Sequence, residues 1–250
     1  MFDEFVPLPR LRGKGLGVGA SAMKKFISIL IIMLFFAPRN AAPQSDGNGA
    51  KPGVRIQCAN LIYGGNKTSQ CFSDRFLMRL STETRIQADP HFYKVRLDSS
   101  DLCRYPFAIM TGEGPFALTE KERAAMRYYL THGGFLLASA GCSDPRWIAA
   151  FRREFAALFP GQKWTTLPFS HPLFRLVYKI DDLGTTHGLL GTTAAKLEAI
   201  LYHGRVVALF SANGLNVSPH AVNCCCCGGD EIEKAEFINV NALAYSVIYN

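Results

Sequence analysis

The chain has 250 residues, enough to bury a full hydrophobic core, and 48% of them are hydrophobic, which excludes an intrinsically disordered polypeptide. The formal net charge is +7, but the lysines and arginines form no stripe in the folded part, so the charge does not indicate a nucleic-acid-binding protein. A chain of this length is expected to hold one folded domain.

The N-terminal region has the pattern of a targeting segment. The basic residues "MKK" at 23–25 precede the apolar run "FISILIIMLFFA" at 26–37. A basic start followed by an apolar run of this length is typical of a secretory signal and is short for a transmembrane helix. We therefore expect Met23 to be the translation start, and residues 1–42 to form an N-terminal extension with this signal-like segment.

The end of the signal-like segment leaves two alternatives open. A cleavage site after Ala42 would place Pro43 first in the mature chain, where signal peptidase generally fails to cut. Asn40 would then occupy position −3, where a small residue is expected. The segment is therefore either cleaved or kept as a membrane anchor. In both cases the chain is expected to be exported, to the periplasm or cell envelope. The Gly/Pro-rich residues 43–53 are expected to be a linker, and residues 54–250 a single domain.

The first predicted elements of the domain are a strand, a helix and a second strand. Residues 54–63 are expected to form the first strand, which ends at a "GGN" turn. Phe72, Phe76, Leu77 and Leu80 follow a helical spacing and predict a helix within residues 70–82. The apolar stretch 107–111 predicts a short strand that runs into a glycine-containing loop.

The next helix carries the clearest start and stop signals. Thr119 and Glu122 have the spacing of a capping box, in which each side chain bonds to the other's backbone N–H. Gly133 stands where a glycine commonly ends a helix. These residues predict a helix that begins after Thr119 and ends just before Gly133.

The second half of the domain continues the alternation of strands and helices. The apolar stretch 135–140 predicts a strand buried on both faces, and Asp144 with Pro145 predicts the start of the following helix. Residues 196–211 are expected to form two strands joined at His203 and Gly204, and residues 237–250 a closing helix. This order predicts an α/β fold with a doubly wound, mostly parallel sheet and some antiparallel additions.

Three loops follow predicted strands: "TGEG" at 111–114, "GCSD" at 141–144 and "ANGLN" at 212–216. Ligands of doubly wound sheets bind at the carboxyl ends of the strands. We therefore expect these three loops to form any binding cleft.

Several motifs together resemble one known family. "YPF", "TG.G.F.L...E", "YL..GGFL", "FRRE" and "HP.F" follow one another in this order. In this combination, residues 54–250 resemble the bacterial family catalogued as domain of unknown function 4159. The resemblance implies a flavodoxin-like fold related to class I glutamine amidotransferases and trehalose-utilisation-type proteins. It implies a cleft but no established reaction, and members that are mostly exported or membrane-attached.

Cys142 is the candidate catalytic residue. It follows a predicted buried strand and precedes a helix whose N-terminus would lower the pKa of a thiol, at the position where the related superfamily carries its nucleophile. Asp144 stands where a nucleophile elbow needs a very small residue, and neither His171 nor His220 belongs to the His-x-Glu pair of that superfamily. Without a base, a thiol is a poor acyl-transfer catalyst.

A ligand-binding role is the first expectation for the three loops. The candidate cleft residues are Thr111, Gly112, Glu113, Gly114, Cys142, His171 and Asn213. His171 is included because it belongs to the "HP.F" motif of the family. The alternative is that it is a half-buried histidine with a structural role only. Arg152 and Arg153, in "FRRE", are expected to form a solvated, ion-pairing face with Glu154, unless one of them points into the cleft and indicates an anionic ligand.

The run "NCCCCGG" at 223–229 holds four of the eight cysteines. Cys224 and Cys227 form C-x-x-C, and His220 is the nearest further ligand, so the run is a candidate Zn or Cu(I) site. Because an exported protein meets an oxidising compartment, pairing with the isolated cysteines in disulfides is the rival interpretation.

Three hypotheses follow. The first is an exported α/β domain that binds a small ligand or an envelope protein at the cleft without a complete catalytic triad. The second is a hydrolase or amidotransferase-like enzyme that uses Cys142. The third is a metal-binding protein built on residues 220–227. None of them involves nucleic acid, and a membrane enters only through an uncleaved N-terminal anchor.

Overall fold

The computed structural model describes residues 54–186, 194–221 and 229–249. All of them belong to one compact unit, Gly49–Asn250. The predicted signal and linker, residues 1–53, lie outside the described residues, so their predictions stay untested. Within the described part, no helix has the length and apolar character needed to cross a membrane.

The described residues form a mixed α/β structure around one sheet of eight strands. Its centre is parallel, in the order β3-β1-β4-β5-β8, and the fold prediction is confirmed to the level of a mostly parallel α/β sheet. These strands are β1 (Cys58–Tyr63), β3 (Tyr93–Arg96), β4 (Phe107–Gly112), β5 (Phe135–Ala140) and β8 (Arg205–Ser211). Antiparallel additions are β2 (Lys67–Thr68) beside β1, and β7 (Glu198–Tyr202) and β6 (Thr165–Thr166) beyond β8.

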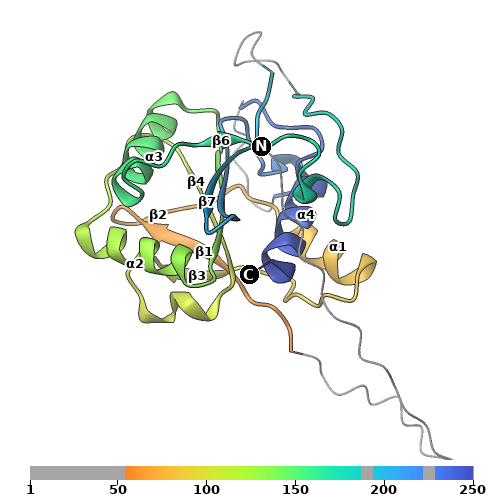
Figure 1. Ribbon diagram of the computed structural model, residues 1–250, viewed down its shortest axis with the longest axis horizontal. Helices are drawn as coiled ribbons and strands as arrows, with labels where there is room; N and C mark the ends of the chain where they lie inside the picture. Colours follow the sequence, from red (N-terminus) through yellow and green to blue (C-terminus); the bar gives the residue numbers. More distant parts are fainter. Residues whose placement is uncertain (1–53, 187–193, 222–228, 250) are drawn as a thin grey trace, which may run out of the picture. The chain divides into compact units, whose positions relative to one another are not determined.

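Four α-helices of the described chain cover the two faces of the sheet (Figure 1). They are α1 (Arg75–Glu83), α2 (Glu120–Thr131), α3 (Pro145–Leu158) and α4 (Ala235–Ile248). Helices α1 and α4 pack together on one face, and α2 and α3 pack together on the other. Three short 3-10 helices, η1 (Ser100–Arg104), η2 (Pro172–Phe174) and η3 (Ser218–His220), complete the described elements. The chain therefore changes face between its first and second crossovers, next to β1 and β4.

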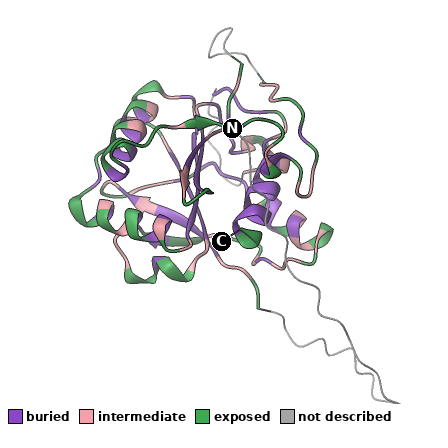
Figure 2. Cartoon of the chain, in the orientation of Figure 1, coloured by how far each residue is buried: buried purple, intermediate pink, exposed green. Residues whose placement is uncertain are grey.

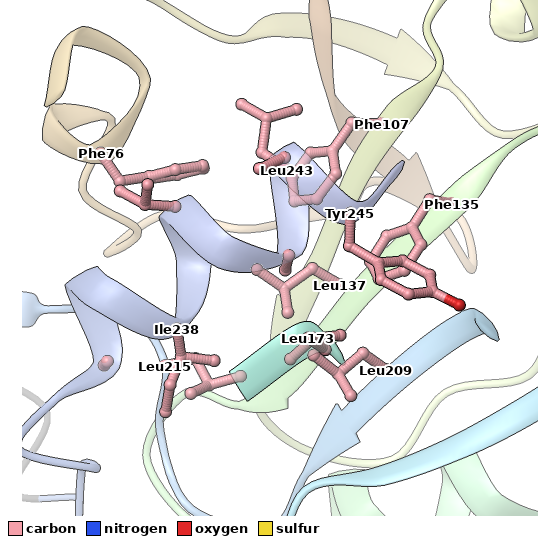
Figure 3. Packing of buried hydrophobic residues seen from close by; sticks show 14 of the residues in the cluster. Phe76, Phe107, Phe135, Leu137, Leu173, Leu209, Leu215, Ile238, Leu243 and Tyr245 are labelled. Carbon is pink, nitrogen blue, oxygen red and sulfur yellow. The ribbon is translucent and has the colours of Figure 1, made fainter. Parts of the chain in front are cut away.

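The sheet is buried between two hydrophobic cores (Figure 2). Under α1 and α4, the rings of Phe107 and Phe135 stack with centroids 5.5 Å apart, and Leu243 of α4 lies close to them (Figure 3). On the opposite face, Phe151 of α3 stacks on Phe210 of β8 at 4.7 Å. A fully buried side chain of this size contributes about 1.5–3 kcal/mol by leaving water, so these layers hold the strands in place.

Local sequence signals set several element boundaries as predicted. The capping box of α2 is present, with Thr119 and Glu122 bonded reciprocally, and α3 begins at Pro145 with Asp144 as its N-cap. The turn between β7 and β8 uses His203 and Gly204, both with positive φ, as a tight two-residue hairpin requires.

The first strand and the first helix begin later than predicted, and α4 begins earlier, at Ala235 instead of residue 237. The first strand begins at Cys58, not at residue 54, because Ile56 forms only an isolated bridge to Ala88. The first helix begins at Arg75, not at residue 70, because the backbone N–H of Ser73 bonds to the backbone oxygen of Asn216, 2.8 Å away. This long-range contact holds the preceding residues in an extended path that leads past the carboxyl ends of the strands.

Candidate functional site

A pocket of about 410 Å³ lies at the carboxyl ends of β4 and β5. Its lining comes from three regions: the β1–β2 hairpin with the extended path after it, the "TGEG" loop, and Gly141 with Cys142. Asn216, from the loop after β8, completes it. The pocket therefore lies where the chain changes face, which is where doubly wound sheets bind their ligands.

Four of the predicted cleft residues meet in this pocket: Thr111, Gly112, Glu113 and Cys142. Gly114 does not line it, and its backbone N–H instead donates to Asp144 Oδ2 over 2.8 Å. That bond ties the "TGEG" loop to the start of α3, so the two loops on either side of the pocket are held to each other.

Glu113 and Cys142 are in direct contact across the pocket. The thiol of Cys142 lies 2.7 Å from Glu113 Oε1 and donates a hydrogen bond to it. On the other side, Lys67 Nζ donates to the backbone oxygen of Glu113 over 2.8 Å. The pocket therefore combines one ammonium, one carboxylate and the half-buried Cys142, and the buried Cys71 also lines it.

A buried hydrogen-bonded chain supports the "TGEG" loop from below. Trp147 Nε1 donates to the hydroxyl of Tyr63 over 2.8 Å, and that hydroxyl donates to the backbone oxygen of Thr111 over 2.9 Å. Burial raises the pKa of Tyr63 well above its usual value. A Cβ atom on Gly112 would lie 2.4 Å from the Tyr63 hydroxyl, so only glycine fits at this position.

The innermost polar groups of the pocket are Thr111 and Asn216, each only 2% exposed. Both side chains lie near Gly141. A Cβ added to Gly141 would lie 3.0 Å from Asn216 Nδ2 and 3.9 Å from Thr111 Oγ1. Among the described residues, none accepts a hydrogen bond from Asn216 Nδ2. The pocket therefore ends at a buried amide that can donate to a bound molecule.

The third predicted loop reaches the pocket through Asn216 and not through the expected Asn213. Asn213 turns away from the pocket, and its Nδ2 donates to the buried carboxylate of Asp230 over 3.1 Å. Asn216, three residues later, lines the pocket instead. The loop sequence "ANGLN" holds both asparagines, and contacts with distant residues, Ser73 and Ser139 for Asn216 and Asp230 for Asn213, set which one faces the pocket.

His171 is not brought to the pocket, contrary to the expectation from the family motif. Its ring lies 5.6 Å from that of Tyr245, whose hydroxyl accepts a bond from the backbone of Val206 near the amino end of β8. His171 Nδ1 accepts from Leu173 N–H at the start of a 3-10 turn, and burial lowers its pKa. His171 therefore makes the contacts of a structural histidine, which was the alternative, near the amino end of β8.

The start of α3 does not supply free positive potential to Cys142. The carboxylate of Asp144 already accepts the N–H of Arg146 in the first helical turn and that of Gly114. No histidine lines the described part of the pocket. The described lining of the pocket therefore places the Cys142 thiol beside the carboxylate of Glu113 and contributes no imidazole.

The comparison with known families shows to which family the chain belongs. A family model described as "Domain of unknown function (DUF4159)" matches residues 57–247. The chain belongs to this family. No curated protein matches the chain. The match covers all of the elements that build the pocket.

The two arginines of the "FRRE" motif point away from the pocket of this DUF4159 domain. Arg153 pairs with Glu154 at 3.1 Å, as predicted, whereas Arg152 pairs with Glu198 on β7. Glu154 is buried and also bonds to Arg123 of α2. The motif therefore joins α3 to its neighbours and contributes no cation to the pocket.

The cysteine run of the DUF4159 domain, with Cys224 and Cys227, lies outside the described residues, so the metal prediction is untested there. His220 is described, and its Nδ1 lies 3.9 Å from Glu236 Oε2. Within residues 54–186, 194–221 and 229–249, no three acidic, histidine or cysteine side chains gather as a metal site would require. No disulfide joins any two of Cys58, Cys71, Cys103 and Cys142.

Asp144 should make the stability of the DUF4159 domain depend on acidic pH. Hydrogen bonds from the Arg146 side chain and from the Gly114 and Arg146 N–H groups hold the pKa of Asp144 well below its usual range. A carboxyl whose pKa is lowered by folding stabilises the fold above its unfolded pKa, about 3.9, and loses that contribution as the pH falls through the folded pKa.

We expect Asp144→Asn to lower the free energy of unfolding by about 1 kcal/mol at pH 7, because an amide cannot accept from both Gly114 and Arg146. The difference should shrink below about pH 4. Urea unfolding at pH 7 and pH 3 measures it. Asp181→Asn, at an exposed ion pair, is the control and should change little at either pH. An Asp144→Asn cost that grows on acidification would contradict the prediction.

Proposed function

We propose that this DUF4159 domain binds a small ligand in the pocket at the carboxyl ends of β4 and β5, without using Cys142 as a nucleophile. The observation that carries the proposal is the buried amide of Asn216, whose Nδ2 faces the pocket with no acceptor among the described residues. A donor that opens only to the pocket is available to a ligand that accepts its hydrogen bond, and such a bond is typically worth about 0.5–1.5 kcal/mol.

The surroundings of Cys142 favour binding over catalysis. Nucleophilic attack needs a thiolate, and the carboxylate of Glu113, 2.7 Å away, opposes negative charge on this sulfur. A second candidate function rests on the same contact: at 2.7 Å, Glu113 could take the proton of Cys142 and generate the nucleophile of a hydrolase. The two functions predict opposite effects of removing the Glu113 charge.

We also propose a cellular location and a fold relation for the domain. The signal-like residues 26–37 support an exported domain of the periplasm or cell envelope, where an envelope protein is the alternative occupant of the site. The strand order β3-β1-β4-β5-β8 is the order 2-1-3-4-5 of flavodoxin-like sheets and supports the proposed relation to that class.

Gly141→Ala should abolish ligand binding and leave the fold intact. The new Cβ would lie 3.0 Å from Asn216 Nδ2, and Gly141 has no positive φ that would strain alanine. A ligand at about 100 times its Kd adds about 2.7 kcal/mol of stability. That gain raises Tm by about 5–10 °C for a domain of this size. We expect such shifts in wild type, from a panel of small polar metabolites, and not in Gly141→Ala.

Gly184→Ala is the matched control, because its Cβ would also meet a side-chain atom at 3.0 Å, Glu233 Oε2, but outside the pocket. It should keep the ligand response of wild type. The proposal fails if no compound raises Tm of the wild-type protein. It also fails if active compounds stabilise Gly141→Ala as much as Gly184→Ala.

A further inference from the structure

The amide of Asn216 is held in one orientation. The buried hydroxyl of Ser139 accepts the N–H of Leu215 over 3.2 Å and donates to Asn216 Oδ1 over 3.1 Å. If the amide were turned over, the Ser139 proton would face an N–H group and would have no acceptor. Ser139 therefore fixes Oδ1 inward and Nδ2 toward the pocket.

The backbone around this amide is also fixed. The oxygen of Asn216 accepts from Ser73 N–H over 2.8 Å, and the oxygen of Leu215 accepts from Asn239 Nδ2 over 2.8 Å. Among the described side chains, the only fully enclosed polar atom without a partner is Asn239 Oδ1. Asn216 Nδ2 is therefore not sealed in the core but opens to the space beside Gly141.

The charges of the pocket disfavour an anionic ligand. Its charged lining residues, in the described chain, are Lys67 and Glu113, and the ammonium of Lys67 already donates to the backbone of Glu113. Asp144 lies next to the pocket and is paired with Arg146. A phosphate would meet one cation that has another partner, together with two carboxylates. Phosphate sites instead gather several cations or free backbone N–H groups.

We infer that the pocket selects an uncharged small molecule by a carbonyl oxygen, which accepts hydrogen bonds from Asn216 Nδ2 and from the hydroxyl of Thr111. This inference rests on the proposed ligand-binding function and specifies its chemistry. A carbonyl oxygen has two lone pairs and matches two converging donors. Both side chains are 2% exposed, so the recognition takes place away from bulk water, where a mismatched group costs most.

Three small probes test the inference by NMR on the full chain. N,N-dimethylacetamide only accepts hydrogen bonds, propylammonium only donates them, and inorganic phosphate is anionic. The side-chain amide signal of Asn216, identified by its loss in Asn216→Asp, is followed during each titration. We expect saturable shifts with N,N-dimethylacetamide at millimolar concentration, as its size allows, and at least tenfold weaker effects of the other two.

Variants then reverse or relax the selection. Asn216→Asp replaces the donor by an acceptor that Ser139 can still bond, so it should lose at least tenfold in affinity for N,N-dimethylacetamide and gain affinity for propylammonium. Ser139→Ala frees the amide to rotate, and the two probes should then bind within about threefold of each other. Asn66→Asp makes the same change at the exposed rim and should leave the wild-type preference in place.

The outcomes separate the two levels of the proposal. If phosphate or propylammonium shifts the Asn216 amide at lower concentration than N,N-dimethylacetamide, the inferred ligand class is wrong although the pocket binds ligands. An unchanged preference in Ser139→Ala would show that Ser139 does not set it and would also overturn the inference. If no probe and no metabolite shifts any pocket signal, the binding function itself fails.

Discussion

Gly112→Ala is expected to destabilise the domain by about 2–3 kcal/mol, although it adds a single methyl group. The added Cβ would lie 2.4 Å from the hydroxyl of Tyr63 and 2.9 Å from Trp147 Nε1. Both aromatic side chains are fully buried and hydrogen-bonded to each other, so neither can move without breaking a bond. Overpacking of this kind costs typically 1–3 kcal/mol. Urea unfolding of the purified variant measures the cost.

Tyr63→Phe tests the cause of that cost. Alone, it leaves the indole N–H of Trp147 and the backbone oxygen of Thr111 without their partner, at about 1–3 kcal/mol for each buried group. In the double variant with Gly112→Ala, however, the atom that the new methyl group meets most closely, the Tyr63 hydroxyl oxygen, is absent. The double variant should therefore be more stable than the sum of the two single costs predicts, by at least about 1 kcal/mol.

Gly184→Ala serves again as the control, because the end of the Glu233 side chain that its Cβ meets can move. It should change the free energy of unfolding by less than about 0.5 kcal/mol. Additive costs for Gly112→Ala and Tyr63→Phe would show that the hydroxyl is not what excludes a side chain at position 112.

Elements with local signals could be predicted from the sequence, because their causes lie within a few residues. The capping box of Thr119 and Glu122 starts α2 where expected, and Asp144 with Pro145 starts α3. Strand β5, buried along its whole length, was equally clear. By contrast, β3 has exposed residues at three of its four positions and carries no comparable pattern. Its place is set by pairing with β1.

The loops that form the candidate site could be predicted from the sequence, but not every side chain that lines it. The rule that ligands bind at strand ends led to Thr111, Gly112, Glu113 and Cys142, which do meet in the pocket. Asn216 and the hairpin residue Lys67 were missed, because a contact 143 residues away along the chain turns the first inward and a backbone contact with Glu113 holds the second. No pattern in the neighbourhood of either residue reports such contacts.

Glu113→Gln is expected to make Cys142 react faster with iodoacetamide near neutral pH, by about threefold to tenfold. The carboxylate lies 2.7 Å from the sulfur, accepts its proton in a hydrogen bond and repels the thiolate. Hydrogen bonds to charged groups are worth about 1.5–3 kcal/mol, so losing this one raises the thiolate fraction. The rate gain is smaller than the gain in thiolate, because a less basic thiolate is also a weaker nucleophile.

The exposed Cys103 is an internal reference, and peptide mass spectrometry after timed alkylation of the reduced protein gives the ratio of the two rates. Glu120→Gln, at an exposed carboxylate on α2, should leave that ratio unchanged. If Glu113 instead acts as the base of a thiol enzyme, Glu113→Gln removes the proton acceptor and the Cys142 rate must fall. A fall would therefore favour the hydrolase over the binding domain, whereas a rise favours the binding domain, in which Cys142 only lines the pocket.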